Sequence, residues 1–240
     1  SSEWRLTEPL ETPAEKSTIE GIIRHLANLK RTRLIGKKRG KGVVEPPKEL
    51  WLYGLEPPRF TVELVDYNGR TERLLVGKKS SFDQSMYVKV DGKPDVMQVP
   101  GALEYQVDKT LYHLRDKRLV AFETENVTKV KVTLNGGEGG YTIERTGSDY
   151  KLTEPRELPA DRVQVTGMLS ALANIRAKEF VSEKAAHEDL ERYGLDKPKA
   201  RVELFFKEGG SSSVVLMSEL KVGGSSTYYA MREGRNPILR

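Results

Sequence analysis

The chain has 240 residues, of which 37% are hydrophobic and 31% are charged, and its formal net charge is +5. This length fits two domains of ordinary size, and the apolar runs are too short to span a bilayer. The absence of cysteine excludes disulfides, thiolate nucleophiles and cysteine-ligated zinc. The mild positive charge favours attraction to anionic partners without identifying one.

The first half of the chain predicts a long helix followed by strands. Thr12, Pro13 and Glu15 form a capping-box pattern with proline at the first helical position. Apolar residues then recur at spacings of three and four through Leu26, which we expect to be buried. A strand at 33–35 and a short helix ending at Gly54 precede alternating strands from residue 60, and the half closes with an amphipathic helix over 103–114.

The second half opens with two additional strands. The alternation in 130–134, the glycine-rich turn at 136–140 and the alternation in 141–145 predict a hairpin. A third strand at 149–152 comes before a helix over 165–175, in which Leu172 is expected to be buried. A strand at 179–181, a short helix ending at Gly194 and strands from residue 200 complete the half.

The two halves repeat one pattern. Residues 4–9, beginning with Trp4 and ending with Pro9, return 146 residues later as Tyr150 to Pro155, and the triplet Tyr53-Gly54-Leu55 returns 140 residues later as Tyr193-Gly194-Leu195. The order of the blocks indicates two copies of one module. We therefore expect an α+β fold of two tandem homologous modules, each a mostly antiparallel sheet with a long helix packed on one face.

We place the modules at residues 1–121 and 122–240. The first module lacks counterparts of the strands in 127–145, and the second lacks a counterpart of the closing helix. We expect the chain to be a trimmed or processed piece of a longer one.

The order of the motifs resembles the bacterial family catalogued as domain of unknown function 4340. The residues that carry the resemblance, and that we expect to have structural roles, are Trp4, Pro9, Tyr53, Gly54, Leu55, Tyr150, Pro155, Tyr193, Gly194 and Leu195. The resemblance implies an extracytoplasmic chain with an N-terminal membrane anchor, missing here, in the company of ABC-type transport components like those of gliding motility. It implies no activity. Ser218 stands where the first copy has Gly77, which departs from the pattern.

The strongest non-structural feature is a basic segment in the first copy. Seven of the twelve residues from Lys30 to Lys41 are Lys or Arg, and the loop part is about six residues longer than its counterpart. Lys37, Lys38, Arg39 and Lys41 are therefore candidates for binding an anionic surface, such as lipid headgroups or a wall polymer. The competing interpretation is a solvated, mobile loop. Aromatic residues are not interleaved, so we expect no nucleic-acid partner.

No residue set predicts catalysis. His25, His113 and His187 lack metal-ligand spacing, and Ala171 replaces His25 in the second copy. The glycine-rich stretches lack the context of a phosphate-binding loop. We expect no cofactor, no metal and no enzyme activity. The leading hypothesis is a scaffold or binding region with protein partners. The alternatives are an anionic-surface binder and a hydrolase with an unrecognised site.

Overall fold

The computed structural model describes residues 3–39, 43–207, 212–222 and 224–240, and the chain forms two compact units, residues 1–116 (unit 1) and 117–240 (unit 2). The fold is a sheet-rich α+β fold, and every strand pairing in the described residues is antiparallel. We expected the modules to divide after residue 121, and the compact units divide slightly earlier. Leu119 and Val120 belong to the buried core of unit 2. No helix in the described residues is long and apolar enough to cross a membrane.

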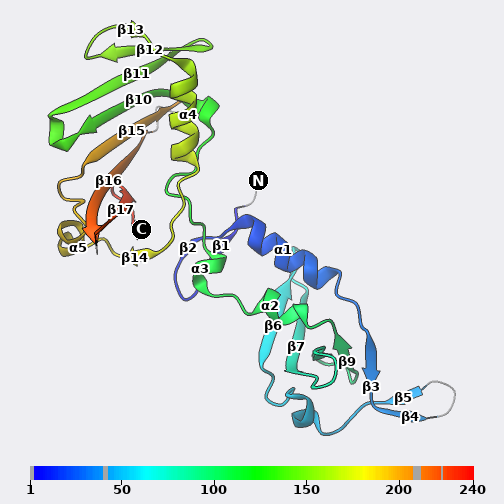
Figure 1. The fold of residues 1–240 in the computed structure, drawn as a ribbon. Helices are drawn as coiled ribbons and strands as arrows, with labels where there is room; N and C mark the ends of the chain where they lie inside the picture. The colour runs from blue at the N-terminus through cyan, green and yellow to red at the C-terminus, as the bar shows by residue number, and fades with distance from the viewer. Residues whose placement is uncertain (1–2, 40–42, 208–211, 223) are drawn as a thin grey trace. The chain divides into compact units, whose positions relative to one another are not determined.

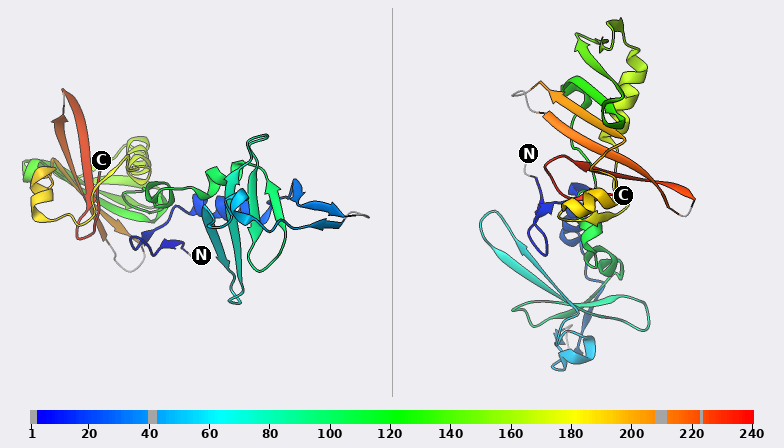
Figure 2. Two further views of the ribbon diagram at one scale, coloured as in Figure 1. Left: turned by 90° about the horizontal axis from the view of Figure 1, so that it is seen from below. Right: turned by 90° about the vertical axis from the view of Figure 1, so that its left-hand side faces the viewer.

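Unit 2 is built on a single large sheet. Its nine strands are ordered β13-β12-β11-β10-β15-β16-β17-β18-β14 (Figure 1). The long ribbon of β16 and β17 extends beyond its neighbours (Figure 2). In chain order the strands are β10 (Val127–Leu134), β11 (Gly139–Thr146), β12 (Asp149–Glu154), β13 (Leu158–Pro159), β14 (Phe180–Ser182), β15 (Ala200–Phe206), β16 (Ser212–Val222), β17 (Ser225–Arg232) and β18 (Ile238–Leu239).

Helix α4 (Arg162–Ala173) packs on this sheet with one apolar face. Val165 and Leu169 are buried in a core shared with β10, β11 and β15. The helix begins where the Asp161 carboxylate accepts hydrogen bonds from the backbone N–H groups of residues 163 and 164, at 2.8 and 3.1 Å. These bonds satisfy donors that have no partner within the helix. A second core packs against Leu190 of α5 (His187–Arg192). Two short 3-10 turns, η2 (Thr124–Asn126) and η3 (Asn135–Gly137), flank β10.

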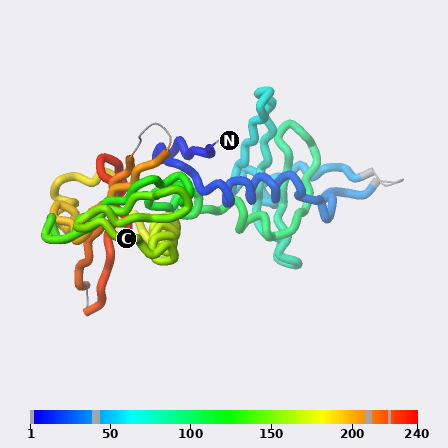
Figure 3. Tube along the Cα trace, turned by 90° about the horizontal axis from the view of Figure 1, so that it is seen from above, coloured from blue at the N-terminus to red at the C-terminus, as the bar shows by residue number. Residues whose placement is uncertain are grey.

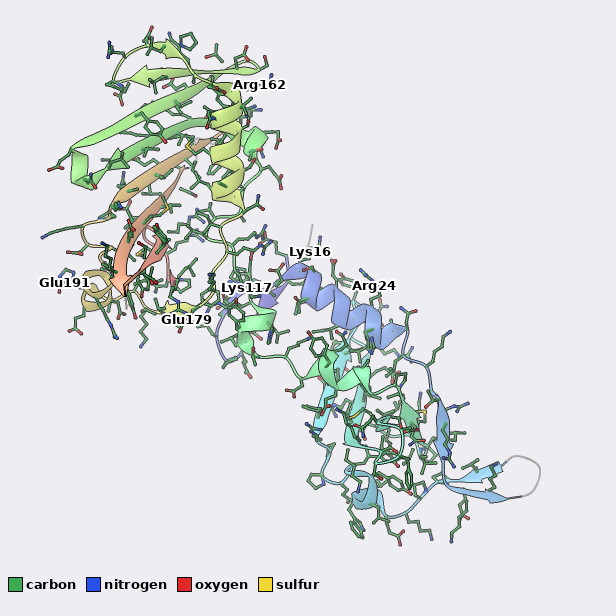
Figure 4. The ribbon with its side chains drawn as sticks, in the orientation of Figure 1. Lys16, Arg24, Lys117, Arg162, Glu179 and Glu191 are labelled. Carbon is green, nitrogen blue, oxygen red and sulfur yellow. The ribbon has the colours of Figure 1, made fainter. Side chains whose placement is uncertain are left out.

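Unit 1 contains a five-stranded sheet, ordered β3-β9-β8-β7-β6, and two separate two-stranded sheets, β1-β2 and β4-β5. Its strands are β1 (Arg5–Leu6), β2 (Thr12–Pro13), β3 (Arg33–Ile35), β4 (Lys37–Arg39), β5 (Val43–Glu45), β6 (Phe60–Val65), β7 (Thr71–Lys79), β8 (Met86–Val90) and β9 (Val96–Val99). Its helices are α1 (Lys16–Ala27), η1 (Leu50–Tyr53), α2 (Ala102–Val107) and α3 (Leu111–Leu114). Figure 4 labels Lys16 and Arg24 on α1 and Arg162 at the start of α4.

The strand orders of the two units correspond. The order β6-β7-β8-β9-β3 in unit 1 matches β15-β16-β17-β18-β14 in unit 2, and β1-β2 matches β12-β13. In unit 2, β11 and β10 stand between β12 and β15 and join the two groups into one sheet. No described strand of unit 1 occupies that place.

The repeated triplets have the same structure in both units. Gly54 and Gly194 end their helices in the left-handed conformation, with φ of 66° and 67°, which glycine adopts without the penalty of a Cβ. Leu55 and Leu195 are both buried, and each N–H bonds back to a helix carbonyl, at 3.1 and 2.8 Å. Each tyrosine packs against a second tyrosine: Tyr53 meets Tyr87 edge-to-face with ring centroids 5.0 Å apart, and Tyr193 meets Tyr229 in a tilted arrangement with centroids 4.8 Å apart.

Three expectations about the helices were wrong. Residues 12 and 13 form β2 rather than a capping box, because their backbone pairs with β1, and α1 begins at Lys16. The closing helix is two short helices, α2 and α3, interrupted at 108–110. Leu26 and Leu172 are only partly buried, although both pack against a core. The buried positions of α4 are Val165 and Leu169, whereas α1 has no buried residue.

Candidate functional site

An apolar concavity of unit 1 lies between the β1–β2 pair and the edge of the five-stranded sheet at β6. It is a cleft of about 880 Å³ lined by residues that precede β1, by α1, by β6 and by the β6–β7 turn. Its apolar lining is Trp4, Ile23, Leu64, Val65 and Tyr67, and its polar lining is Glu3, Glu63, Asp66, Arg70 and Glu72. Exposed aromatic and branched side chains grouped in one concavity are typical of a surface that another segment covers.

The same positions are closed in unit 2. Tyr150 is 8% exposed and Leu204 is 0% exposed, whereas their counterparts Trp4 and Leu64 are 39% and 41% exposed. Leu169 is fully buried, while its counterpart Ile23 is half-buried and lines the cleft. Strands β10 and β11 account for the difference, because their apolar residues share one core with Tyr150, Leu169 and Leu204.

Unit 2 has an open apolar face of its own. A cleft of about 630 Å³ is lined by Met217, Tyr228, Ala230 and Leu239 together with the segment that follows α4. Tyr228 is 65% exposed. In unit 1 the sheet core is closed by Leu103 of α2, and Met86 on β8 is 0% exposed. Each unit therefore leaves open a face whose counterpart in the other unit is covered by that other unit's own residues.

Part of the basic segment, Lys37–Arg39, forms strand β4 of a β-hairpin and not the loop predicted from the sequence, while Arg33 lies in β3. Strands β4 and β5 pair from Lys37–Glu45 to Arg39–Val43, and the hairpin projects away from the five-stranded sheet (Figures 1 and 3). Lys37 and Lys38 are exposed. Since neighbouring residues of a strand point to opposite faces, these two ammonium groups belong to different sides of the hairpin. Lys41 lies outside the described residues.

Gly36 allows the hairpin to leave the sheet. Its φ is 151°, and a Cβ at this position would overlap the carbonyl oxygen of Glu45. A cleft of about 690 Å³ lies at the base of the hairpin. Its charged lining is Arg33, Lys37, Lys38 and Lys48, with Glu45 and Glu49. The cations outnumber the carboxylates here, so an anionic group would be attracted to this side of unit 1.

The carboxylates with displaced pKa values each have hydrogen-bond partners of their own. A hydrogen bond from Lys79 holds the pKa of Glu104 below its ordinary value, and Arg59 adds a second ion pair. The pKa values of Asp83, Glu125 and Glu219 are lowered as well, through hydrogen bonds from Ser85, from the backbone at residue 125 and from Lys199. A lowered pKa favours the charged carboxylate, so each of these groups is stabilised as an anion and is a poor proton donor.

Each histidine has different surroundings. His25 lies in α1, and its Nε2 is buried without a hydrogen-bond partner. His113 Nδ1 lies 2.8 Å from the Thr110 hydroxyl in α3, and His187 Nε2 lies 3.3 Å from Glu191 in α5. In the part of the chain that the structure describes, no three His, Asp or Glu side chains gather as metal ligands would.

The substitution of Gly77 by Ser218 is explained by a local contact. Tyr53 presents its carbonyl oxygen to Gly77, where a Cβ would overlap it. In unit 2 the Ser218 hydroxyl donates a hydrogen bond to the Tyr193 carbonyl. The equivalent carbonyl groups are therefore treated differently: in unit 1 a glycine leaves room for the Tyr53 carbonyl, and in unit 2 a serine side chain donates a hydrogen bond to the Tyr193 carbonyl. Sequence alone identified the position but not this role.

Comparison with known proteins gives one family. The family model described as Domain of unknown function (DUF4340) matches residues 4–151 and 150–240, as two tandem segments. No curated protein and no solved structure matches the chain. The family match agrees with the resemblance drawn from the repeated motifs, and the first matched segment extends through β10 and β11 of unit 2.

Proposed function

The chain belongs to the family described as Domain of unknown function (DUF4340), and from this premise we propose that it is a non-enzymatic scaffold or binding region. In this proposal it works outside the cytoplasm, as part of a membrane-anchored protein that accompanies an ABC-type transport system of the gliding-motility kind. Its partners are proteins of that system. Each module supplies a rigid sheet with a helix packed on one face.

The observation that carries the proposal is what the two copies share. In both units the repeated triplet ends a helix, buries a leucine and packs a tyrosine against a second tyrosine. These are roles in packing and chain direction. The titratable groups differ between the copies, since Ala171 replaces His25 and the ion pairs of Glu104 involve residues of unit 1 alone. Duplication has kept a shape rather than a reactive group, which suits a scaffold.

The proposal is tested in cells that express the natural full-length protein with a C-terminal tag. We expect the protein in the membrane fraction, cleavable by protease added from the extracytoplasmic side, and crosslinked to the permease of the transport system encoded beside it. A matched strain that lacks the permease controls for chance crosslinking. Recovery of the protein in the soluble cytoplasmic fraction, or hydrolysis of a defined substrate by the purified chain, would overturn the proposal.

A second candidate function is binding to an anionic surface through the β4–β5 hairpin. The projection of the hairpin and the excess of cations at its base favour it. Replacing Lys37, Lys38, Arg39 and Lys41 with Ser should abolish binding to vesicles that contain phosphatidylserine at low salt, since each contact is worth about 1 kcal/mol near such a surface.

The control for this test is a variant from which four cations are removed in unit 2, away from the hairpin. Each of Lys129, Lys131, Lys178 and Lys197 is changed to Ser. The control variant carries the same net charge as the hairpin variant but keeps the hairpin. Binding that weakens equally in both variants, or persists in the hairpin variant, would leave only the scaffold function.

A further inference from the structure

We propose that the cleft of unit 1 is the receptor for a β-hairpin that resembles β10–β11 and is joined directly to β1. The hairpin would complete the sheet of unit 1 as β10 and β11 complete the sheet of unit 2. This inference concerns how the module is assembled and goes beyond the scaffold function, which would stand without it.

The positions around the cleft form one matched set. In unit 2, five residues from three elements (β12, α4 and β15) are buried around β10 and β11, and in unit 1 each counterpart is at least partly exposed. The pairs, with unit 2 first, are Tyr150 and Trp4, Val165 and Ile19, Leu169 and Ile23, Val202 and Val62, and Leu204 and Leu64. All five counterparts are apolar. A surface that normally faced water would have no reason to keep apolar residues at every one of these positions.

The backbone of unit 1 is open at the same place. β6 ends the five-stranded sheet, and β1 pairs only with β2 among the described residues. In unit 2 the corresponding edges are filled, since β15 pairs with β10 and β12 pairs with β11. An open edge presents unpaired N–H and C=O groups that a further strand can satisfy. Two strands are needed, because two stand between β12 and β15.

The side-chain pattern of β10 and β11 fits the cleft. Val130 and Val132 of β10 lie opposite Leu204 and Val202 of β15, whose counterparts Leu64 and Val62 lie on β6. Ile143 of β11 pairs with Leu152, whose counterpart is Leu6 on β1. An alternating hairpin would therefore place its apolar face on α1 and leave its polar face in solvent.

The connection in unit 2 explains why we assign the hairpin to the same polypeptide. Only Gly147 and Ser148 separate β11 from β12, with Gly147 in the left-handed conformation at φ 62°. The equivalent connection would deliver a hairpin straight into β1. A tether of two residues keeps the effective concentration of the hairpin very high, so a hairpin too weak to bind as a free peptide can still be held.

The test uses the 240-residue chain with Trp51→Phe, which leaves Trp4 at the cleft as the sole tryptophan. In the fused protein, a second copy of residues 127–148 replaces the first two residues and runs directly into Glu3. We expect the acrylamide quenching constant of Trp4 to fall about fivefold, in the ratio of the 39% exposure of Trp4 to the 8% exposure of Tyr150. The emission maximum should shift to shorter wavelength.

Two matched variants keep the test decisive if the fused chain folds poorly. One carries threonine at the copies of Val130, Val132 and Ile143, which preserves strand propensity and removes the apolar face. The other is the fused chain with Leu64→Lys, a change at a position already 41% exposed without the hairpin. We expect neither to protect Trp4. Protection in the threonine variant equal to that in the parent fusion, or quenching unchanged by the fusion, would overturn the proposal. Equal protection by an equimolar free peptide of residues 127–146 would show that a separate chain suffices, which overturns the covalent assignment.

Discussion

Replacing Leu169 with alanine is the sharpest test of the core of unit 2. The side chain of Leu169 is 0% exposed and packs between α4 and the sheet. Leu→Ala removes three carbon atoms, which at about 0.8 kcal/mol each amounts to about 2.4 kcal/mol of lost transfer free energy. The cavity left between two rigid layers adds to this, so we expect a loss of about 3–4 kcal/mol.

The matched substitution Ile23→Ala removes a side chain from the counterpart position in unit 1. Ile23 lines an open cleft, so part of its surface is already in water and no closed cavity forms. We expect a loss of about 1–2 kcal/mol, smaller than the Leu169→Ala effect. The comparison separates burial from helix propensity, since both residues lie at equivalent positions of 12-residue helices.

The assay follows denaturant unfolding with two signals. Both tryptophans, Trp4 and Trp51, lie in unit 1, so tryptophan emission reports that unit alone, whereas far-ultraviolet circular dichroism reports both units. Leu169→Ala should move a transition seen only by circular dichroism, and Ile23→Ala should move the tryptophan transition. A Leu169→Ala loss below about 1 kcal/mol would refute the packing argument. An equal shift of the tryptophan transition would refute independent unfolding of the units.

Three further substitutions test local contacts. Gly77→Ala should destabilise unit 1 by about 1–3 kcal/mol in the tryptophan transition, because the added Cβ would overlap the Tyr53 carbonyl oxygen; an unchanged midpoint would contradict this close approach. Glu104→Gln should lower the free energy of unfolding at pH 7 by about 1–2 kcal/mol. Because the pKa of Glu104 is held below its ordinary value of 4.5, the unfolded chain takes up the proton first, so this stabilisation is lost as the pH falls below about 4.5 and the variant should converge on the parent in acid titration. Asp161→Ala should cost about 1 kcal/mol in circular dichroism melts, whereas Glu15→Ala, at a helix start without a side-chain cap, should cost less; equal losses would argue against the cap.

The local patterns of the sequence predicted the elements well where neighbours in the chain decide them. The strand at 33–35 is β3, and the left-handed glycines at 54 and 194 end their helices. The predictions failed where distant residues decide. Thr12 and Pro13 carry a capping signal, but pairing with β1 holds them in a strand. The apolar stripe of α1 was expected to be buried, yet burial depends on two strands that unit 1 does not present.

The candidate sites were predictable to a smaller extent. The sequence identified Lys37 and Lys38 within a basic insertion, but the run of positive charge does not predict that Lys37 pairs with Glu45 and Lys38 with Val44, the strand pairing that places the two lysines on opposite faces. The apolar cleft was missed, although its cause was visible in the sequence. The repeat shows that the first copy lacks counterparts of 127–145, and removing two central strands from a sheet must expose whatever they cover. What could not be inferred is which residues line the opening, because that depends on the pairing of β15 with β10.

The two segments matched by the family model do not coincide with the two compact units of the structure. The first family segment ends at residue 151, inside β12, so it includes β10 and β11, which fold as part of unit 2. A fragment cut at the family boundary, residues 150–240, would lose both strands and expose the core around Leu169, whereas residues 117–240 keep the sheet whole.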